Sequence, residues 1–460
     1  MQIIFFLCNY YRIKAAIISL SIISILTLLA TSLQAGTLEK YVQKKDTSFM
    51  WKSINHKKFQ DATITHIELT SQTWHNLPWN HHIQIVRPHI LQNPGISFLF
   101  VAGDGDGSRE IEPLSFIAQK TGTIAAVITN IPNQPLFQGL LEDALIAYTF
   151  DQYLKTKDES WPLLFPMVKS VVRGMDTIQA FMQKEHQQQV DAFVLSGASK
   201  RGWTTWLTAA TDQRVAAIAP MVFDVLNMKK QTDWAEKMYG RQSEKIEDYT
   251  NRNLVARINE PGMVVLQKWV DPYHYRQRYT MPKLLLLGTN DPYWVVDSLR
   301  HYWNDLPEPK HVYQTPNAGH DLGGGKEAIQ TLAAWYWMIV NGKDLPKIEW
   351  LLRDGSNGPA GITVRTDQPP EKIRLWTTQS DDRDFRNNLW SSQDLEIILN
   401  NYYQSSAEIP VPSKGFKAFM GEVELTSPFG NTYKLSTQVQ VTPDTVAVHN
   451  PGKNEQREKR

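Results

Sequence analysis

Three side chains that are far apart in the sequence carry the groups needed for acyl transfer: Ser199, Asp291 and His320. A serine hydroxyl is a weak nucleophile until a base takes its proton. Histidine titrates near neutral pH, so it can accept that proton and return it to a leaving group. A carboxylate beside the imidazole fixes its tautomer and stabilises the imidazolium. These residue types predict Ser199 as the nucleophile, His320 as the base and Asp291 as the acid that orients it.

The segment around Ser199 is typical of a buried strand that runs into a tight turn and then a helix. The apolar run Ala192–Leu195 is followed by Gly197-Ala-Ser199. In such a turn a side chain two residues before the serine would collide with neighbouring backbone, which explains the glycine there. The pattern departs from Gly-x-Ser-x-Gly, because Arg201 stands where a small residue is expected and the glycine follows one residue later.

Backbone N–H groups are expected to bind the negative charge that develops on an acyl oxygen. One belongs to Lys200, at the N-terminus of the predicted helix, where unpaired N–H groups and the helix dipole favour an anion. The other is expected from Gly103 or Asp104, in a Gly-Asp-Gly-Asp-Gly loop after another apolar run. Each such donor contributes about 3 kcal/mol to transition-state stabilisation.

The acid and the base each follow a predicted strand. The buried strand Lys283–Leu287 ends shortly before Asp291, and the next strand, His311–Thr315, is followed by a loop that carries His320. Carboxyl ends of parallel strands meet at one sheet edge, so these side chains are expected to converge with Ser199, in the chain order Ser, Asp, His. Alternatives remain open: Asp291 as a simple helix cap before Pro292, His320 as a surface residue, and the rival acids Asp224, Asp297 and Asp321.

Alternation of apolar strands with helical patterns predicts an α/β fold with a doubly wound, mostly parallel sheet. An antiparallel hairpin precedes it. The predicted strands are Thr63–Thr70, His82–Arg87, Ile96–Ala102, Thr123–Thr129, Ala192–Leu195, Ala216–Phe223, Lys283–Leu287 and His311–Thr315. The predicted helices are Leu141–Lys155, Leu163–Glu185, one from about Lys200, one near Val295–Asn304, and Lys326–Val340.

The alternation is interrupted once and then ends, which divides the chain. Residues 36–350 are expected to form the α/β domain, with 225–280 as a polar, aromatic and helical insertion over the carboxyl edge of the sheet. After a linker at Asp354–Pro359, residues 358–447 are expected to form a small β-sandwich-like domain, and 448–460 a disordered tail. Its predicted strands are Ile362–Arg365, Lys372–Thr378, Phe416–Leu425 and Lys434–Val441.

Residues 1–35 have the features of a signal peptide. Arg12 and Lys14 precede the apolar run Ala15–Ala30, and no acidic residue occurs before Glu39. The run has the length of a signal-peptide core and is short for a membrane span. Cleavage is expected after Ser32 or Ala35; an uncleaved anchor is the alternative. The single cysteine, Cys8, lies in this segment, so the mature chain is predicted to be neither a disulfide scaffold, a thiol enzyme nor a Cys-ligated zinc protein.

Composition excludes some partners and suggests a cleft. A formal net charge of +1 provides no field to attract nucleic acid or an acidic membrane. Fifteen tryptophans indicate an aromatic-rich core or an aromatic-lined cleft. Arg201 and Lys200 could bind a substrate carboxylate or phosphate, or form salt bridges to Glu142 or Asp143. The aromatic candidates for the cleft are Trp203, Tyr293 and Trp294, with Trp206, Trp234 and Trp269 as further candidates that core packing would equally explain.

No metal or other cofactor is expected. The run from Asp104 to Ser108 resembles the start of a calcium loop, but Arg109 replaces the required glycine and Ser115 the final glutamate. His75, His81 and His82 lack metal-ligand spacing on a defined element.

Several strings in the chain resemble the PhoPQ-activated pathogenicity-related protein family, from about Tyr41 to Val441. The strings are Gly197–Trp206, Glu142–Tyr148, Trp161–Lys169, Trp269–Tyr273, Met281–Lys283, Gly288–Pro292 and Pro316–His320. The family is similar to α/β-hydrolases, so the resemblance implies that fold, an exported protein, a link to virulence or envelope stress, and roles for Ser199, Asp291 and His320 on the matching motifs. The turn at Ser199 alone also looks like that of glucuronoyl esterases, which have a basic residue after the serine.

The sequence thus predicts an exported serine hydrolase, periplasmic or secreted, that acts on an ester or peptide acyl group, with esterase favoured over peptidase. The expected partner is a small-molecule or peptide acyl substrate; nucleic acid and a stable membrane span after signal cleavage are not expected. The alternative is a non-catalytic binding or signalling protein that keeps the α/β-hydrolase fold.

Overall fold

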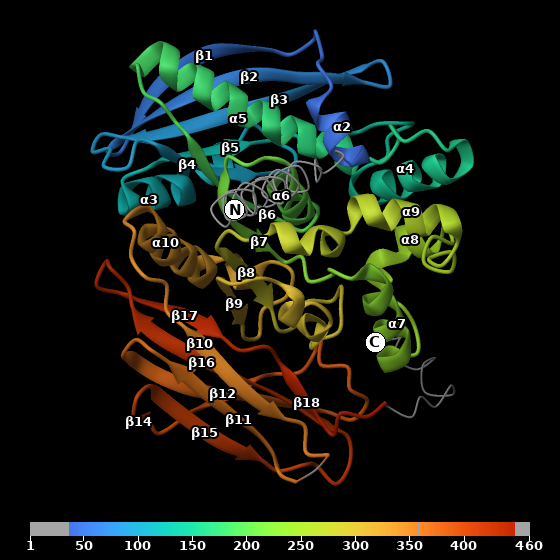
Figure 1. The fold of residues 1–460 in the computed structure, drawn as a ribbon, viewed down its shortest axis with the longest axis vertical. Helices are drawn as coiled ribbons and strands as arrows, with labels where there is room; N and C mark the ends of the chain where they lie inside the picture. The colour runs from blue at the N-terminus through green and yellow to red at the C-terminus, as the bar shows by residue number, and fades with distance from the viewer. Residues whose placement is uncertain (1–35, 357, 447–460) are drawn as a thin grey trace, which may run out of the picture.

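A sheet of nine strands forms the centre of the molecule (Figure 1). The computed structural model describes residues 36–356 and 358–446; the predicted signal peptide and tail lie outside these residues. The strand order is β1-β2-β3-β5-β4-β6-β7-β8-β9. The bounds are β1 Met50–Phe59, β2 Ala62–Trp74, β3 Leu77–Pro88, β4 Ile96–Val101, β5 Ile124–Ile128, β6 Ala192–Ala198, β7 Val215–Met221, β8 Lys283–Gly288 and β9 Lys310–Thr315.

The sheet has an antiparallel part and a parallel part. Strands β1, β2, β3 and β5 pair antiparallel, whereas β5, β4, β6, β7, β8 and β9 pair parallel. The predicted hairpin and all six buried strands are confirmed. Strand β1 was not predicted, because it is an edge strand whose side chains are mostly exposed and carry little apolar alternation.

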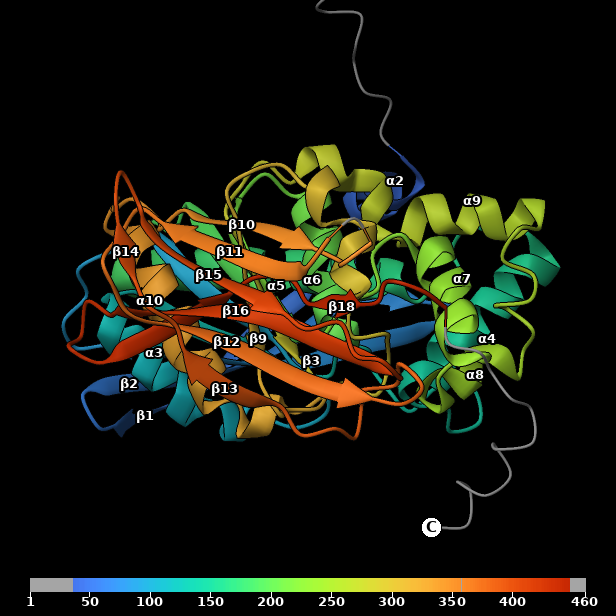
Figure 2. The same ribbon diagram turned by 90° about the horizontal axis from the view of Figure 1, so that it is seen from below.

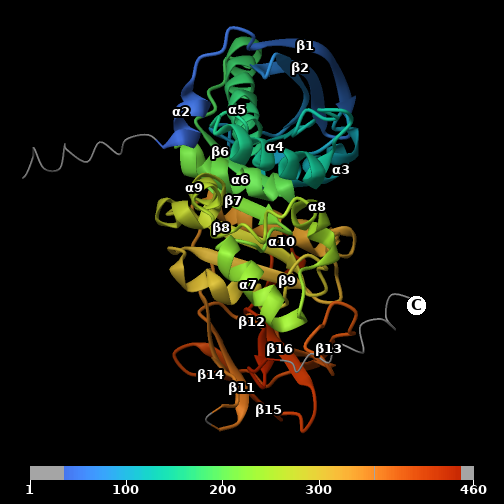
Figure 3. The ribbon, with the colours of Figure 1, turned by 90° about the vertical axis from the view of Figure 1, so that its right-hand side faces the viewer.

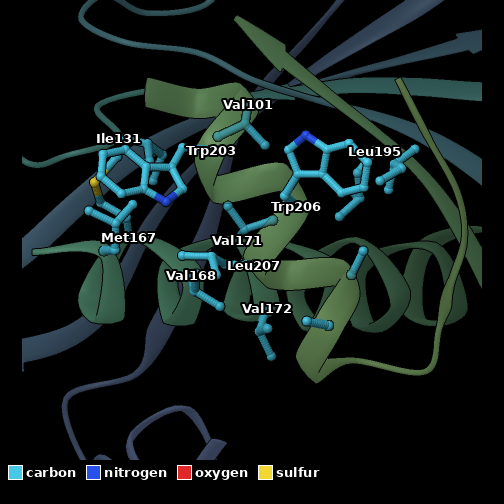
Figure 4. Close-up of a cluster of buried hydrophobic side chains, with 14 of the residues drawn as sticks. Val101, Ile131, Met167, Val168, Val171, Val172, Leu195, Trp203, Trp206 and Leu207 are labelled. Carbon is cyan, nitrogen blue, oxygen red and sulfur yellow. The ribbon is translucent and has the colours of Figure 1, made fainter. Parts of the chain in front are cut away.

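Helices cover both faces of the sheet. Helices α2 (Thr37–Gln43), α5 (Leu164–His186) and α6 (Lys200–Thr211) pack on one face, and α3 (Ile111–Thr121) and α10 (Lys326–Val340) on the other. Figure 4 shows α6 on α5, with Leu207 beside Val168, Val171 and Val172 of α5. Burial on both faces explains why the parallel strands β4 to β8 are nearly continuous apolar runs. This arrangement is the predicted α/β-hydrolase fold.

The predicted insertion is helical and lies beside the carboxyl ends of the central strands, next to α4 (Glu142–Thr156) (Figures 1 and 3). It contains α7 Met228–Tyr239, η2 Glu244–Ile246, α8 Glu247–Thr250, α9 Pro261–Val270 and η3 Pro272–Arg278. The predicted helix near Val295–Asn304 is wrong: two short 3₁₀ segments, Ser298–His301 and Trp303–Asp305, stand there. Within residues 36–356 and 358–446, no helix combines the length and the apolar character needed to cross a bilayer.

The C-terminal part is a sandwich of two antiparallel sheets (Figure 2). One sheet has the order β10-β11-β15-β14 and the other β13-β12-β16-β17, with β18 on β16. Strand β10 precedes the predicted linker, so the sandwich begins before residue 358, and the predicted strand Lys434–Val441 is two strands. The bounds are β10 Ile348–Arg353, β11 Ala360–Thr366, β12 Pro370–Ser380, β13 Ser391–Asp394, β14 Ile398–Leu399, β15 Tyr403–Ile409, β16 Phe416–Thr426, β17 Thr432–Ser436 and β18 Gln440–Thr442.

The sandwich is fused to the α/β domain by a shared core. Strand β17 packs against β9 and α10, and one apolar cluster contains side chains of β8, α10, β11 and β16. The sandwich therefore has a fixed position beside the last two strands of the large sheet, which are the strands that precede the predicted acid and base.

Candidate active site

Ser199 occupies a strained turn between β6 and α6. Its φ is 57° and its ψ is −122°, a backbone conformation that residues other than glycine rarely adopt. The backbone N–H of Ser199 donates to the carbonyl oxygen of Met221, 2.9 Å away on the neighbouring strand β7. Strain of this kind persists only where the surrounding structure enforces it, which is the situation of a nucleophile held at the end of a strand.

Two glycines and one arginine explain how the turn closes. A Cβ on Gly197 would lie 2.8 Å from the carbonyl oxygen of Arg201, and a Cβ on Gly202 would lie 3.0 Å from that of Gly197. The arginine side chain fits because Gly103, on the loop after β4, leaves room: a Cβ there would stand 2.6 Å from a guanidinium nitrogen. The missing glycine at position 201 is thus compensated by a glycine on the adjacent loop.

Arg201 is a structural residue of the turn. Only 8% of it is exposed, its Nε donates to the carbonyl oxygen of Ile131, and its two terminal nitrogens bind the two carboxylate oxygens of Glu142 at 2.7 and 2.6 Å. Burial opposes ionisation of Glu142, but Arg201 and Lys200 prevail and lower its pKa to about 2. The geometry does not favour the prediction that Arg201 binds substrate, because its guanidinium is already paired with Glu142. This pair is the salt bridge that was the alternative prediction.

The Lys200 side chain forms salt bridges with two carboxylates of α4. Its Nζ is 2.8 Å from Asp143 and 3.2 Å from Glu142. Burial works against its charge, yet these carboxylates raise the pKa of Lys200 overall. Lys200 is the first residue of α6, so its backbone N–H has no carbonyl oxygen within the helix to which it could donate a hydrogen bond. The loop with Gly103 and Asp104 lies next to this turn because β4 and β6 are paired, but the assignment of its N–H groups to an oxyanion stays a prediction.

Asp291 and His320 are brought together as predicted. Nδ1 of His320 is 2.7 Å from Oδ2 of Asp291, whose side chain is 1% exposed. The other carboxylate oxygen accepts the backbone N–H of Tyr293 at 3.0 Å. Asp291 therefore caps a turn at Pro292 and also binds the imidazole. The alternative of a helix cap is wrong, because a turn and not a helix begins at Pro292.

The rival acids are bound elsewhere. Asp297 binds Arg383, Arg300 and the indole of Trp234, and Asp321 accepts the N–H of Gly323 at a surface turn. Asp224 accepts the hydroxyl of Tyr302 at 2.6 Å. None of the three has a hydrogen bond to His320 among the described residues, which leaves Asp291 as the acid of this histidine.

The hydrogen bond between the predicted nucleophile and base is not formed. Within residues 36–356 and 358–446, Nε2 of His320 is buried and has no hydrogen-bond partner, Ser199 included. The rings of Tyr293 and Trp294 pack against the imidazole, with centroid distances of 4.3 and 5.8 Å. Catalytic hydrogen bonds are often long without substrate and tighten in the reacting complex. The structure thus leaves Nε2 of His320 without a hydrogen bond to Ser199, and the role of this histidine as a base stays a prediction.

A segment of the sandwich braces the loops of the acid and the base. Nδ2 of Asn290 lies 2.9 to 3.3 Å from three backbone carbonyl oxygens of residues 385–388. The side chain of Asn317 exchanges two hydrogen bonds with the backbone of Trp390, at 2.7 and 3.0 Å. Neither asparagine was predicted as a site residue, although both lie inside the motifs Gly288–Pro292 and Pro316–His320. The sandwich is therefore part of what positions Asp291 and His320.

Replacing Gly288 by alanine is expected to lower kcat about a hundredfold, because an error of about 1 Å in the position of a catalytic group has an effect of that size. A Cβ at Gly288 would stand 2.4 Å from the carbonyl oxygens of Ala318 and Gly319, so the loop with His320 must move. Steady-state hydrolysis of an acyl ester measures the change. Gly319→Ala is the control, since the nearest atom to its Cβ among the described residues would be 3.8 Å away. Equal rates for the two variants would contradict this placement of His320.

A pocket opens beside Ser199. It encloses about 1030 Å³ of empty space, its open mouth included, and its wall contains Ser199, Lys200 and three predicted substrate contacts, Trp203, Tyr293 and Trp294. Much of the remaining wall comes from the insertion. Trp206 and Trp269 belong instead to the core, and Trp234 packs near the pocket against Arg300 and Arg383. In the described part of the chain, no three His, Cys, Asp or Glu side chains are grouped to hold a metal.

Comparison with known proteins gives relatives at several distances. The profile of the PhoPQ-activated pathogenicity-related protein family matches residues 38–386. Autocrine proliferation repressor protein A of Dictyostelium discoideum is 30% identical over 469 residues, which cover 92% of this chain and 94% of that protein. Among solved structures, acetyl xylan esterase 1 from Thermoanaerobacterium matches with a TM-score of 0.47 and 14% identity, over 66% of this chain and 92% of that one. An acetyl xylan esterase from Paenibacillus matches with a TM-score of 0.46 and 16% identity, over 64% and 91%. The extent of the profile match and of the Dictyostelium relative shows that the chain belongs to the PhoPQ-activated pathogenicity-related protein family.

Proposed function

We propose that the protein is a serine hydrolase that cleaves carboxylic esters with Ser199, His320 and Asp291. The observation that carries the proposal is the Asp291–His320 pair at 2.7 Å, with the second imidazole nitrogen buried and without a hydrogen-bond partner in the described part of the chain. Ser199 stands at the end of β6 in a strained turn, on the wall of the same pocket that Tyr293 and Trp294 line. A strained serine and an oriented histidine at one sheet edge are the parts that acyl transfer requires.

The reaction would proceed in two steps, acylation of Ser199 and then hydrolysis of the acyl-enzyme. Oγ of Ser199 forms a bond to the acyl carbon while its proton passes to Nε2 of His320, and the bond from that carbon to the alcohol oxygen breaks as His320 protonates the alcohol. Water then attacks the acyl carbon in the same way and releases the acid and free Ser199. The N–H of Lys200, with one from Gly103 or Asp104, stabilises the oxyanion in both steps.

Export to the periplasm or to the medium is part of the proposal, on the basis of the features of residues 1–35. Esters are favoured over peptides as substrates. The link to virulence or envelope stress rests on the family resemblance alone.

A second candidate function is a binding or signalling protein that keeps the fold without turnover. The relative in Dictyostelium, whose name describes a repressor of proliferation, supports this alternative, as does the absence of a hydrogen bond between Ser199 and His320. The two functions differ in whether the serine can be made nucleophilic.

Labelling with a fluorophosphonate probe tests the proposal. We expect the probe to modify Ser199, because its oxygen attacks phosphorus and displaces fluoride once His320 takes its proton; peptide mapping locates the adduct. Ser199→Ala should abolish labelling, whereas Asp321→Asn, next to His320 but on the surface, should retain it. A folded wild-type protein that is not labelled would support the binding function instead.

A further inference from the structure

The pocket beside Ser199 is apolar along most of its wall. Phe150, Trp203 and Phe223 form an aromatic cluster on one side, with Trp203 and Phe223 stacked at 5.4 Å. Leu254 and Met263, from the insertion and both nearly fully buried, also line it. Burying an aliphatic chain against such a surface is favourable by about 0.8 kcal/mol for each methylene.

The charged groups of the pocket wall neutralise each other. Of the side chains that line it in the described part of the chain, Lys200 and Asp143 are the charged ones, and their charged atoms lie 2.8 Å apart. The hydroxyl of Tyr249 donates to the same aspartate at 2.9 Å. Binding a carboxylate or phosphate there would require breaking this pair, so the pocket suits an uncharged group.

The amide donors in the wall are also occupied. Nε2 of Gln231 donates to the carbonyl oxygens of Leu226 and Ser298, and Nε2 of Gln242 donates to that of Thr232. A sugar placed here would lose hydrogen bonds to water without gaining these donors, which is unfavourable. The chemistry of the wall therefore selects an aliphatic group over a carbohydrate.

The position of His320 indicates which half of an ester enters the pocket. The leaving oxygen must face Nε2 of His320, which protonates it. His320 does not line the pocket; Tyr293 and Trp294 line it and pack against the imidazole. The leaving alcohol is thus directed toward His320, and the pocket on the side of Lys200 and Trp203 is left for the acyl chain.

We propose that this pocket binds an uncharged aliphatic acyl chain, so that the substrate class is carboxylic esters with an aliphatic acyl group longer than acetyl. This inference rests on the proposed hydrolase function and specifies its substrate. A chain that replaces water along the apolar wall gains binding in the transition state with each methylene, up to the length of the pocket.

A series of p-nitrophenyl esters from acetate to dodecanoate tests the inference on the wild-type protein. The expected kcat/KM rises about fourfold for each added methylene, hence about two hundredfold from acetate to hexanoate, and falls once the chain exceeds the pocket. A parallel series of acetates with longer alcohols should stay flat. Constant or falling kcat/KM along the acyl series, with turnover that depends on Ser199, would overturn the acyl pocket and leave the hydrolase function standing. A dependence on the alcohol instead would assign the pocket to the leaving group. No Ser199-dependent turnover of any ester would overturn both proposals.

A variant that shortens the pocket provides the second measurement. Ala235 lines it from α7, so Ala235→Phe should move the optimum to shorter chains and lower the ratio of hexanoate to acetate kcat/KM about tenfold. Lys230→Phe adds the same ring to the exposed face of the same helix and should leave the ratio unchanged. Equal ratios in the two variants would contradict the inference.

Discussion

Replacing Ser199 by alanine is expected to lower kcat for ester hydrolysis by about six orders of magnitude, since nucleophile, base and acid act as a unit. The residual rate would come from the oxyanion donors and the pocket, which the substitution leaves in place. Steady-state kinetics on p-nitrophenyl hexanoate measures the change. The fold should not depend on the hydroxyl, because no hydrogen bond from it is present among the described residues.

Ser196→Ala is the matched control for this prediction. Ser196 lies on the same strand, is fully buried, and donates its hydroxyl to the carbonyl oxygen of Ala219 at 2.6 Å. Its loss should lower the free energy of unfolding by about 1 kcal/mol and leave kcat within a few-fold of the wild type. If Ser199→Ala hydrolysed the ester as fast as Ser196→Ala, the nucleophile would lie elsewhere and the proposed function would be wrong.

The parallel strands and the order of the site residues were predictable because they depend on local patterns. Strands buried on both faces are rich in apolar residues. Ser199 and Asp291 follow the apolar runs of β6 and β8, whereas His320 follows β9, in which polar and apolar residues are mixed. The carboxyl ends of parallel strands meet at one edge, so the meeting of Asp291 and His320 followed from topology before any distance was known.

Other features could not be predicted because they depend on contacts between distant segments. The fit of Arg201 at its turn requires the space left by Gly103 on a different loop, and its role depends on the carboxylate of Glu142. The brace from the sandwich depends on Asn290 and Asn317 meeting a segment beyond β12. Strands β13 and β14 were missed because they are short and exposed, without the alternation that one buried face produces.

Asp291→Asn is expected to lower kcat by about four orders of magnitude with little change in fold. An amide that replaces the carboxylate presents an N–H group to Nδ1 of His320, which then acts as an acceptor. The imidazole proton is displaced to Nε2, which can no longer take the proton of Ser199. The rate should be measured over a range of pH with the preferred ester, because a tautomer defect persists at every pH whereas a simple pKa change would move the profile.

Asp224→Asn is the decisive comparison, because Asp224 is also a buried acid at the end of a neighbouring strand, β7. Burial raises the pKa of Asp224 well above its usual range, against the hydrogen bond from Tyr302 and with the charges of Asp291 and Asp297 adding to the rise. An asparagine oxygen can accept the same tyrosine hydroxyl, so the substitution keeps this hydrogen bond and removes only the acidic group. We expect kcat to stay within a few-fold of the wild type. If kcat fell as far in Asp224→Asn as in Asp291→Asn, the carboxylate of Asp291 would not be what orients His320. The acid would then have to be assigned to Asp224, after β7.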